Sequence, residues 1–251
     1  MGTNTDISWT DHTHNLFWGC FKVSEECKYC YAEGFAKRVG KHIWGPAVNT
    51  DRWILSENNF KKPFKWNKDA LAEGRRHRVF CSSMSDLYED HPAVVEIRNR
   101  FFREVIPATP WLDWQFLTKR PENILKMSPA AWSQDWPSNV WIGTSVGTQA
   151  RAIERIPELL NVPARVRFLS CEPLLEEIDL TPWLSDLQWI ICGGESGPKH
   201  RPFNPEWARI LRDQCLEANV AYFFKQHGGF HHDSGGNLLD GRTWQAFPLA
   251  A

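Results

Sequence analysis

The sequence has no apolar stretch close to the roughly 20 residues that a membrane-spanning helix needs, which argues against an integral membrane protein. Its first residues form neither a basic nor an apolar segment, so we expect no secretory signal and a cytoplasmic protein. The formal net charge is −1, so no broad positive field indicates nucleic-acid binding. Phosphate-loop, zinc-protease and serine-hydrolase motifs are missing as well. The hydrolase classes that these motifs identify therefore have no support.

The sequence does contain enough apolar residues for a large core. It has 251 residues, of which 42% are hydrophobic, and α/β barrels often reach this length without splitting. We therefore predict a single domain over residues 1–251. Two basic runs, at 61–68 and 75–78, and 14 tryptophans leave a nucleic-acid or nucleotide contact open. A solvated face and ordinary core packing are the simpler explanations.

Short apolar, β-prone runs recur along the chain, each followed by small or polar residues. The predicted strands are 78–81, 114–117, 139–143, 166–169, 187–192 and 220–224. Helix-like segments between them predict parallel βαβ units. We therefore expect an α/β fold, a partial (β/α) barrel of about six parallel strands with its chemistry at the carboxyl ends of the strands. A doubly wound open sheet is the alternative.

The predicted helices are 93–105, 149–156 and 205–218. Thr148 is the expected cap of the second helix, and Pro157 is expected to end or kink it. Asn204 and Pro205 are the expected start of the third. Residues 34–73 fit the strand–helix rhythm poorly, so we interpret them as an elaborated connection or lid. Residues 228–251 are turn-rich, and we expect them to form a closing segment.

The cysteines are concentrated in one short segment. Cys20, Cys27 and Cys30 lie within eleven residues, where three thiolates can bind one metal centre. A structural zinc ion or an electron-transfer cluster normally has a full set of protein ligands. Three ligands leave one metal position open to a cofactor or substrate. We therefore favour an iron–sulfur cluster. Zinc with a further ligand from elsewhere in the chain remains the alternative, and a reducing compartment disfavours disulfides.

The cysteine segment resembles the radical S-adenosylmethionine superfamily, because Tyr29 precedes its last cysteine and Tyr31-Ala-Glu33 follows it. The first gap between the cysteines is wider than is usual in that superfamily. Further segments resemble a phage- and prophage-associated branch of that superfamily over nearly the whole chain. They are Trp9-Thr-Asp11, Ser83-Met-Ser-Asp86, Leu117-Thr-Lys-Arg-Pro121, Ser170-Cys-Glu-Pro-Leu174, Gly193-Gly-Glu-Ser-Gly197 and Phe224-Lys-Gln226.

The resemblance implies a mechanism. Cys20, Cys27 and Cys30 would hold a [4Fe–4S] cluster whose remaining iron is chelated by S-adenosylmethionine. One electron, from a donor such as flavodoxin or ferredoxin, would cleave the cofactor to a 5′-deoxyadenosyl radical, which would take a hydrogen atom from the substrate. The substrate stays open, with a preference for nucleic acid or a nucleotide. The alternatives are a zinc- or cluster-containing nucleic-acid-binding module, and a non-catalytic redox sensor or partner subunit.

Polar side chains after the predicted strands are the candidates for binding the cofactor. Its ammonium group would be bound by Ser83, Ser85 and Asp86, and its carboxylate by Lys119 or Arg120. Its ribose would contact Ser145 and Glu172, and its adenine would contact Tyr29. Glu195, in a glycine-rich turn, is expected to face adenosine or substrate. The candidates for an anionic substrate are His200, Arg201, Lys225 and Gln226. Caps, turns and surface polarity are the simpler alternative roles.

Overall fold

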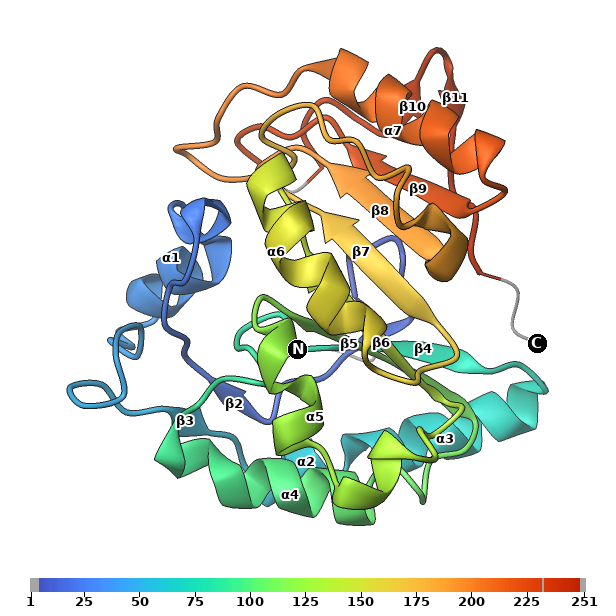
Figure 1. Ribbon diagram of the computed structural model, residues 1–251. Coiled ribbons are helices and arrows are strands. Elements are labelled where there is room, and N and C mark those ends of the chain that lie inside the picture. The colour runs from blue at the N-terminus through green and yellow to red at the C-terminus, as the bar shows by residue number, and fades with distance from the viewer. Residues whose placement is uncertain (1–4, 232, 249–251) are drawn as a thin grey trace. The chain divides into compact units, whose positions relative to one another are not determined.

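The computed structural model describes residues 5–231 and 233–248. The fold is α/β, a partial barrel built on a seven-stranded sheet in the order β1-β4-β5-β6-β7-β8-β9 (Figure 1). The pairings β1–β4, β4–β5, β6–β7, β7–β8 and β8–β9 are parallel. The strands are β1 (His12–Thr13), β4 (His77–Cys81), β5 (Leu112–Thr118), β6 (Val140–Ser145), β7 (Arg167–Cys171), β8 (Trp189–Gly193) and β9 (Ala221–Gln226). The predicted fold class is confirmed.

All six predicted strands are present, and the seventh, β1, was missed. It has two residues, too few for any periodic pattern, and it forms by pairing His12 with Val79 and Thr13 with Phe80. Two small antiparallel sheets accompany the main one. They consist of β2 (Phe17–Trp18) with β3 (Trp53–Ile54), and β10 (Leu238–Leu239) with β11 (Arg242–Thr243).

The predicted helices are present with shifted ends. The helices are α1 (Tyr31–Arg38), α2 (Glu57–Phe60), α3 (Lys62–Glu73), α4 (Val95–Glu104), α5 (Ile124–Met127), α6 (Gln149–Leu160) and α7 (Pro205–Glu217). Short 3₁₀ turns are η1 (Glu25–Cys27), η2 (Pro92–Val94), η3 (Pro121–Asn123), η4 (Ala130–Ser133) and η5 (Leu184–Asp186). The Asn204 side chain caps α7 by accepting from the backbone N–H of Glu206.

Pro157 does not end α6, which continues to Leu160. Ile156 and Leu159 are both fully buried on this helix. Of these two, Leu159 lies beyond the proline, and burying it contributes roughly 1.5–3 kcal/mol, which offsets much of the roughly 3 kcal/mol that a proline inside a helix costs. Burial of the apolar face thus favours continuing the helix past Pro157.

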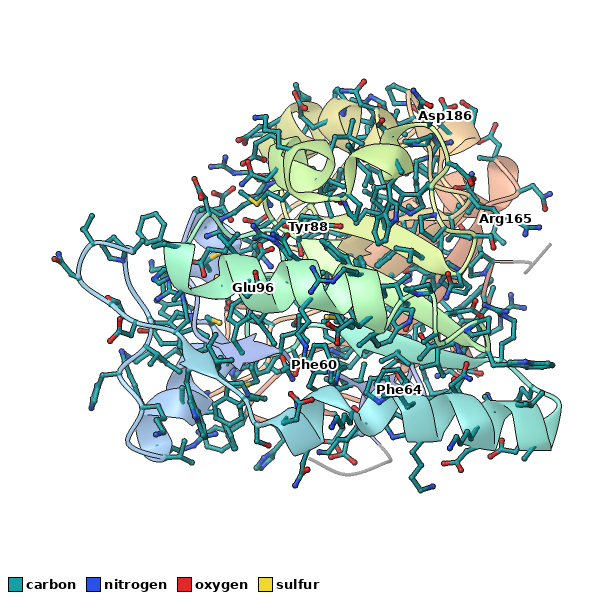
Figure 2. All side chains as sticks on the ribbon, turned by 90° about the horizontal axis from the view of Figure 1, so that it is seen from below. Phe60, Phe64, Tyr88, Glu96, Arg165 and Asp186 are labelled. Carbon is teal, nitrogen blue, oxygen red and sulfur yellow. The ribbon has the colours of Figure 1, made fainter. Side chains whose placement is uncertain are left out.

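The chain forms two compact units. Unit 1 comprises Met1–Val23, Ala32–Trp141 and Val162–Arg165, and unit 2 comprises Ser24–Tyr31, Ile142–Asn161 and Val166–Ala251. The core of unit 1 is rich in aromatic rings, among them Trp66, Trp114 and Tyr88. The core of unit 2 contains Trp189 and Phe223 from two neighbouring strands. Figure 2 marks Tyr88 and Phe60, both buried, and the exposed Glu96 on α4.

The single domain and the lid at 34–73 stay predictions. Residues 34–73 contain most of α1, the strand β3 that pairs with β2, and the helices α2 and α3. The expected closing segment contains the hairpin β10–β11, and its positions 232 and 249–251 lie outside the described residues. Within the described ranges, no helix combines the length and the apolar character needed to cross a bilayer.

Candidate active site

Cys20, in unit 1, lies beside a buried guanidinium. Arg120 Nη1 is 3.8 Å from Cys20 Sγ, and Arg120 Nη2 donates to the carbonyl of Phe21 at 2.5 Å. Asp86 accepts from the same guanidinium at 2.8 Å. Burial raises the pKa of the Cys20 thiol to about 12, although the charge of Arg120 opposes the shift. The structure therefore places a hydrogen-bond donor next to the first cysteine of the three.

Asp86 is a buried carboxylate that follows β4 and receives donors from the end of β5. Besides Arg120, it accepts from Thr118 Oγ1 at 2.7 Å and from the backbone N–H groups of Tyr88 and Lys119, both at 3.0 Å. Burial alone would raise its pKa, but the Arg120 charge and these donors hold the pKa below its usual value. Asp86 is thus an ionised anchor that fixes Arg120 toward Cys20.

The loop after β4 runs along the segment that leads to Cys20. The backbone N–H of Gly19 donates to the Met84 carbonyl at 3.0 Å, and Gly19 pairs with Ser85 as an isolated parallel bridge. Ser83 Oγ accepts from Asn15 Nδ2 at 3.0 Å. The Ser85 hydroxyl is buried and has no hydrogen-bond partner in the described part of the chain. Ser83, Ser85 and Asp86, predicted as one group, are therefore brought together near Cys20.

Gly19 has a geometric reason to be glycine. Its φ is +116°, and a Cβ there would lie 2.5 Å from the Ile43 carbonyl oxygen and 2.6 Å from Arg52 Cδ. Arg52 is itself locked in a buried ion pair with Glu89, with both nitrogen–oxygen distances at 2.8 Å. The chain before Cys20 is thus packed tightly against a rigid pair.

In unit 2, the turn that carries Cys27 is tied to α6 by two carboxylates. Glu26 Oε1 accepts from Arg155 Nη1 at 3.1 Å and from the backbone N–H of Gly147 at 3.0 Å. Both side chains of this ion pair are almost fully buried. Glu25, which is half-exposed, pairs with Arg151 at 3.0 Å. These contacts fix η1, and Arg151 and Arg155 stand one turn apart on the same helix face.

Glu195 and Arg201 form a third tie to the same turn. The carboxylate accepts from Arg201 Nε at 2.9 Å and from Nη2 at 2.6 Å, and Arg201 Nη1 donates to the Glu25 carbonyl at 3.1 Å. The guanidinium lies 5.5 Å from the centre of the Tyr29 ring. Tyr29, Glu195 and Arg201 are therefore close together, and both oxygens of Glu195 face Arg201.

A second polar group lies where β7, β8 and β9 end. Lys225 Nζ is 3.0 Å from Glu172 Oε1. The Gln226 amide donates to the Gly194 carbonyl at 3.0 Å, which fixes the orientation of the amide, and its buried Oε1 has no partner in the described ranges. A Cβ at Gly193 would lie 2.8 Å from Glu172 Oε1. Glu172, Lys225 and Gln226 are thus grouped as predicted.

The remaining two predicted residues, Ser145 and His200, adjoin these groups. Ser145 ends β6 in the interior, where its backbone carbonyl accepts from Arg155 Nη1 at 2.7 Å. His200 is exposed and its Nδ1 lies 2.8 Å from the Gly197 carbonyl, which is typical of a turn. Sequence reasoning missed Glu26, Arg151 and Arg155. Two features of the sequence could have indicated them: the acidic pair Glu25-Glu26 inside the cysteine segment, and the four-residue spacing of Arg151 and Arg155 on a predicted helix.

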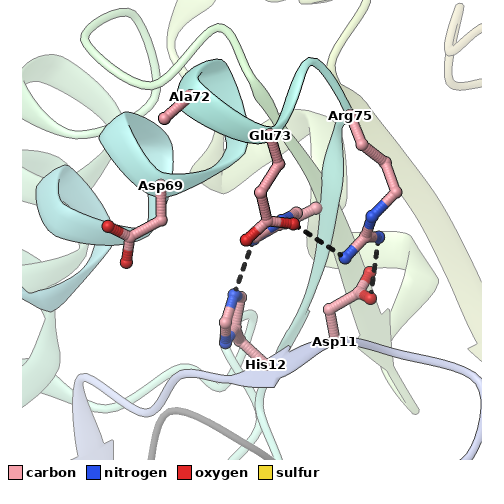
Figure 3. A pocket seen from close by; sticks show the side chains of 7 residues that line it. Asp11, His12, Asp69, Ala72, Glu73 and Arg75 are labelled. Atoms are coloured by element: carbon pink, nitrogen blue, oxygen red, sulfur yellow. Dashed lines mark hydrogen bonds and ion pairs between the residues drawn. The ribbon is translucent and has the colours of Figure 1, made fainter.

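A hollow at the opposite ends of the unit 1 strands contains a separate charged group (Figure 3). His77 lies 2.9 Å from Glu73 and 3.0 Å from His12, while Arg75 pairs with Asp11 at 2.9 Å. Arg75 also lies 3.6 Å from Glu73. Such pairing at the amino ends of parallel strands is typical of a contribution to stability.

The four other cysteines are buried in the core. Burial raises the pKa of Cys81 and of Cys192 to about 12, and it raises that of Cys171 and Cys215 as well. Cys20, Cys27 and Cys30 are only partly buried. Within the described residues, no three or more His, Cys, Asp or Glu side chains are arranged to hold a metal ion.

Comparison with known proteins gives a family but no activity. No curated protein matches the sequence. A solved structure of a cysteine-to-serine mutant of spore photoproduct lyase is similar, with 12% sequence identity and a TM-score of 0.49. The similarity covers 86% of this chain but 64% of that chain, so this chain spans less than two thirds of that protein. Residues 4–248 match the family of proteins of unknown function DUF5131, and the chain belongs to that family.

Proposed function

We propose that the protein is a radical S-adenosylmethionine enzyme in which Cys20, Cys27 and Cys30 bind a [4Fe–4S] cluster. One observation carries the proposal. These three cysteines are only partly buried, and the chain around them is anchored by arginine–carboxylate pairs next to the ends of parallel strands: Arg120–Asp86 in unit 1, and Arg201–Glu195 in unit 2. Chemistry in such folds takes place at those strand ends.

The residues present fit the cluster and its cofactor in donor chemistry. Cysteine thiolates are the usual ligands of iron–sulfur clusters, and three of them leave an iron position for another ligand. The buried Ser85 hydroxyl and Gln226 Oε1 have no partner among the described residues, so each can bind a polar group of a ligand. When bound, the cluster and S-adenosylmethionine supply radical hydrogen-atom abstraction.

The protein's own residues would position these groups. Arg120 can donate to the sulfur of Cys20, which stabilises the thiolate form that a cluster requires. Ser83, Ser85 and Lys119 remain the proposed contacts of the cofactor in unit 1, with Asp86 acting through Arg120. Their closeness to the Cys20 segment supports this assignment.

In unit 2, Tyr29, Ser145, Glu172 and Glu195 remain the proposed contacts of adenosine. Lys225 and Gln226 would bind the substrate, with His200 at the exposed margin. Arg201 holds Glu195 and the Glu25 carbonyl, so we assign it a positioning role beside any substrate contact. We further propose a cytoplasmic location, a flavodoxin or ferredoxin as electron donor, and a nucleic acid or nucleotide as substrate. The phage association of the sequence stays a prediction.

The decisive experiment is anaerobic reconstitution with analysis of iron and sulfide. Treatment with dithionite and S-adenosylmethionine follows, and 5′-deoxyadenosine is measured. We expect about four irons per chain and a 5′-deoxyadenosine product. Zinc without the visible absorbance of a thiolate-bound cluster would contradict the proposal and favour a structural-metal module. A cluster that never cleaves the cofactor would favour a redox sensor or partner subunit.

Cysteine variants supply the matched control. Alanine at Cys20, Cys27 or Cys30 should abolish cluster binding, while Cys192→Ala and Cys215→Ala should retain it, measured per folded chain after gel filtration. The latter two thiols are buried in the core of unit 2. If the loss of Cys192 or Cys215 removes the iron as completely as the loss of Cys27, the three-ligand assignment is wrong.

A further inference from the structure

One exposed face of unit 1 combines aromatic rings with cations. Its residues are Phe21, Phe35, Lys37, Arg38, Lys41 and Trp53. We call it the α1–β3 face, after the two elements that Figure 1 labels. The exposed fractions are 44% for Phe21, 37% for Phe35 and 38% for Trp53. Exposed aromatic side chains that gather in one region mark contact surfaces more often than single exposed ones do.

Ring and cation contacts join Phe35, Arg38, Lys41 and Trp53 into one surface. Trp18 meets both Phe35, at 5.7 Å between ring centres, and Trp53, at 5.0 Å. Arg38 lies 5.7 Å from the centre of the Phe35 ring, and Lys41 lies 4.3 Å from that of Trp53. The ribbon register places Trp18 opposite Trp53 and so holds the rings together.

The α1–β3 face is positively charged although the protein has a net charge of −1. Glu33 is bound by two lysines, Lys22 and Lys37, each at 2.6 Å. Arg38 and Lys41 add two further cations over the rings. Cations therefore outnumber carboxylates among the connected side chains, and a partner with an acidic surface would be complementary.

The same face leads directly to Cys20. Phe21 is the next residue in the chain, and Arg120 binds both the Phe21 carbonyl and the Cys20 sulfur. The Lys22–Glu33 ion pair connects this segment to α1. A protein that docks on the face would thus lie next to the first proposed cluster ligand, where an electron has to enter.

We propose that the α1–β3 face is the docking surface for a small acidic one-electron carrier protein. This inference rests on the proposed function, which requires a reductant. An apolar centre with a charged margin matches the composition of protein interfaces, and electron-transfer contacts are small and depend on charge. Single-stranded nucleic acid fits less well, because Lys41 and Arg38 already lie over the rings on which bases would stack.

The test compares two reductants on the reconstituted protein. The variant combines Lys37→Glu, Arg38→Glu and Lys41→Glu, and the control combines Lys61→Glu, Lys65→Glu and Lys68→Glu at exposed lysines of the α2–α3 region. Formation of 5′-deoxyadenosine is followed with reduced flavodoxin and, separately, with dithionite, which is too small to need a docking surface. The flavodoxin series is repeated at low and high salt.

We expect the face variant to lose about tenfold or more of the flavodoxin-supported rate and to retain the dithionite-supported rate. The control should keep both rates. The wild-type rate with flavodoxin should fall as salt screens the charges, and the dithionite rate should change less.

Three outcomes would overturn the inference and leave the proposed function intact. Equal flavodoxin rates for the wild type and the face variant would exclude the surface. Equal losses with both reductants would show that these residues serve the fold or the chemistry. In the third outcome, the wild type and the control bind a fluorescent single-stranded oligonucleotide, and the face variant does not, while its flavodoxin-supported rate is unchanged. That result would assign the face to nucleic acid. No product with either reductant in the wild type would instead refute the proposed function, and this inference with it.

Discussion

His14 should make the folded protein sensitive to acid. Its ring is fully enclosed by Trp66, Phe101 and Trp114, with ring centres 5.8 to 5.9 Å away. Neither ring nitrogen has a hydrogen-bond partner in the described part of the chain. Burial, assisted by the charge of Lys62, lowers the pKa of His14 from 6.5 to about 3. The folded state therefore requires a neutral imidazole.

Protonation of His14 therefore favours the unfolded chain. Because the folded pKa is depressed, the unfolded chain binds a proton below pH 6.5 that the folded chain refuses. The contribution of the neutral ring is thus present above pH 6.5 and is lost as the pH falls toward about 3. One proton is worth about 1.4 kcal/mol per pH unit. The loss accrues only below the unfolded pKa of 6.5, about 1.5 units above pH 5, so between about pH 7 and about pH 5 it amounts to about 2 kcal/mol.

The measurement is urea unfolding followed by tryptophan fluorescence at about pH 7 and about pH 5. We expect His14→Phe to remove about 2 kcal/mol of the wild-type difference between the two values, whatever its effect on absolute stability. Other titrating groups are common to both proteins and cancel. His42→Phe, at an exposed histidine, should keep the full difference. An unchanged difference in His14→Phe would refute the reasoning.

Two further predictions compare buried with exposed positions in urea unfolding. Glu26→Gln should lower the free energy of unfolding by about 3–5 kcal/mol, because it leaves the buried Arg155 without its carboxylate. Glu25→Gln, at the half-exposed pair with Arg151, should lower it by about 1 kcal/mol or less. Similar losses would show that the burial of the first pair does not matter. Gly147→Ala should lower the free energy of unfolding by about 1–3 kcal/mol, because its Cβ would meet the backbone carbonyl oxygen of Pro173 and would lie 2.7 Å from Glu26 Cγ. Gly34→Ala, with open space in α1, should raise it by up to about 1 kcal/mol. Equal effects at the two glycines would contradict the packing there.

The sequence alone predicted the alternation of strands and helices, because fully buried parallel strands are short apolar runs with polar ends. It also contains a segment of three cysteines, and their role as ligands of one metal centre stays a proposal. Both signals are local. The expectation that Pro157 ends α6 is wrong for the same reason, because a local rule ignores the burial of Leu159 beyond it, while a kink at Pro157 stays a prediction.

Only the tertiary structure decided which polar groups meet. Glu26 and Arg155 are 129 positions apart, and Arg120 and Cys20 are 100 apart, so no periodic pattern links them. Likewise, Glu195 looked like an available carboxylate, yet its oxygens face Arg201. Strand β1 forms only because β4 offers it an edge. Local periodicity follows from the repeat of the backbone, whereas such partners are chosen by which distant segments the fold packs together.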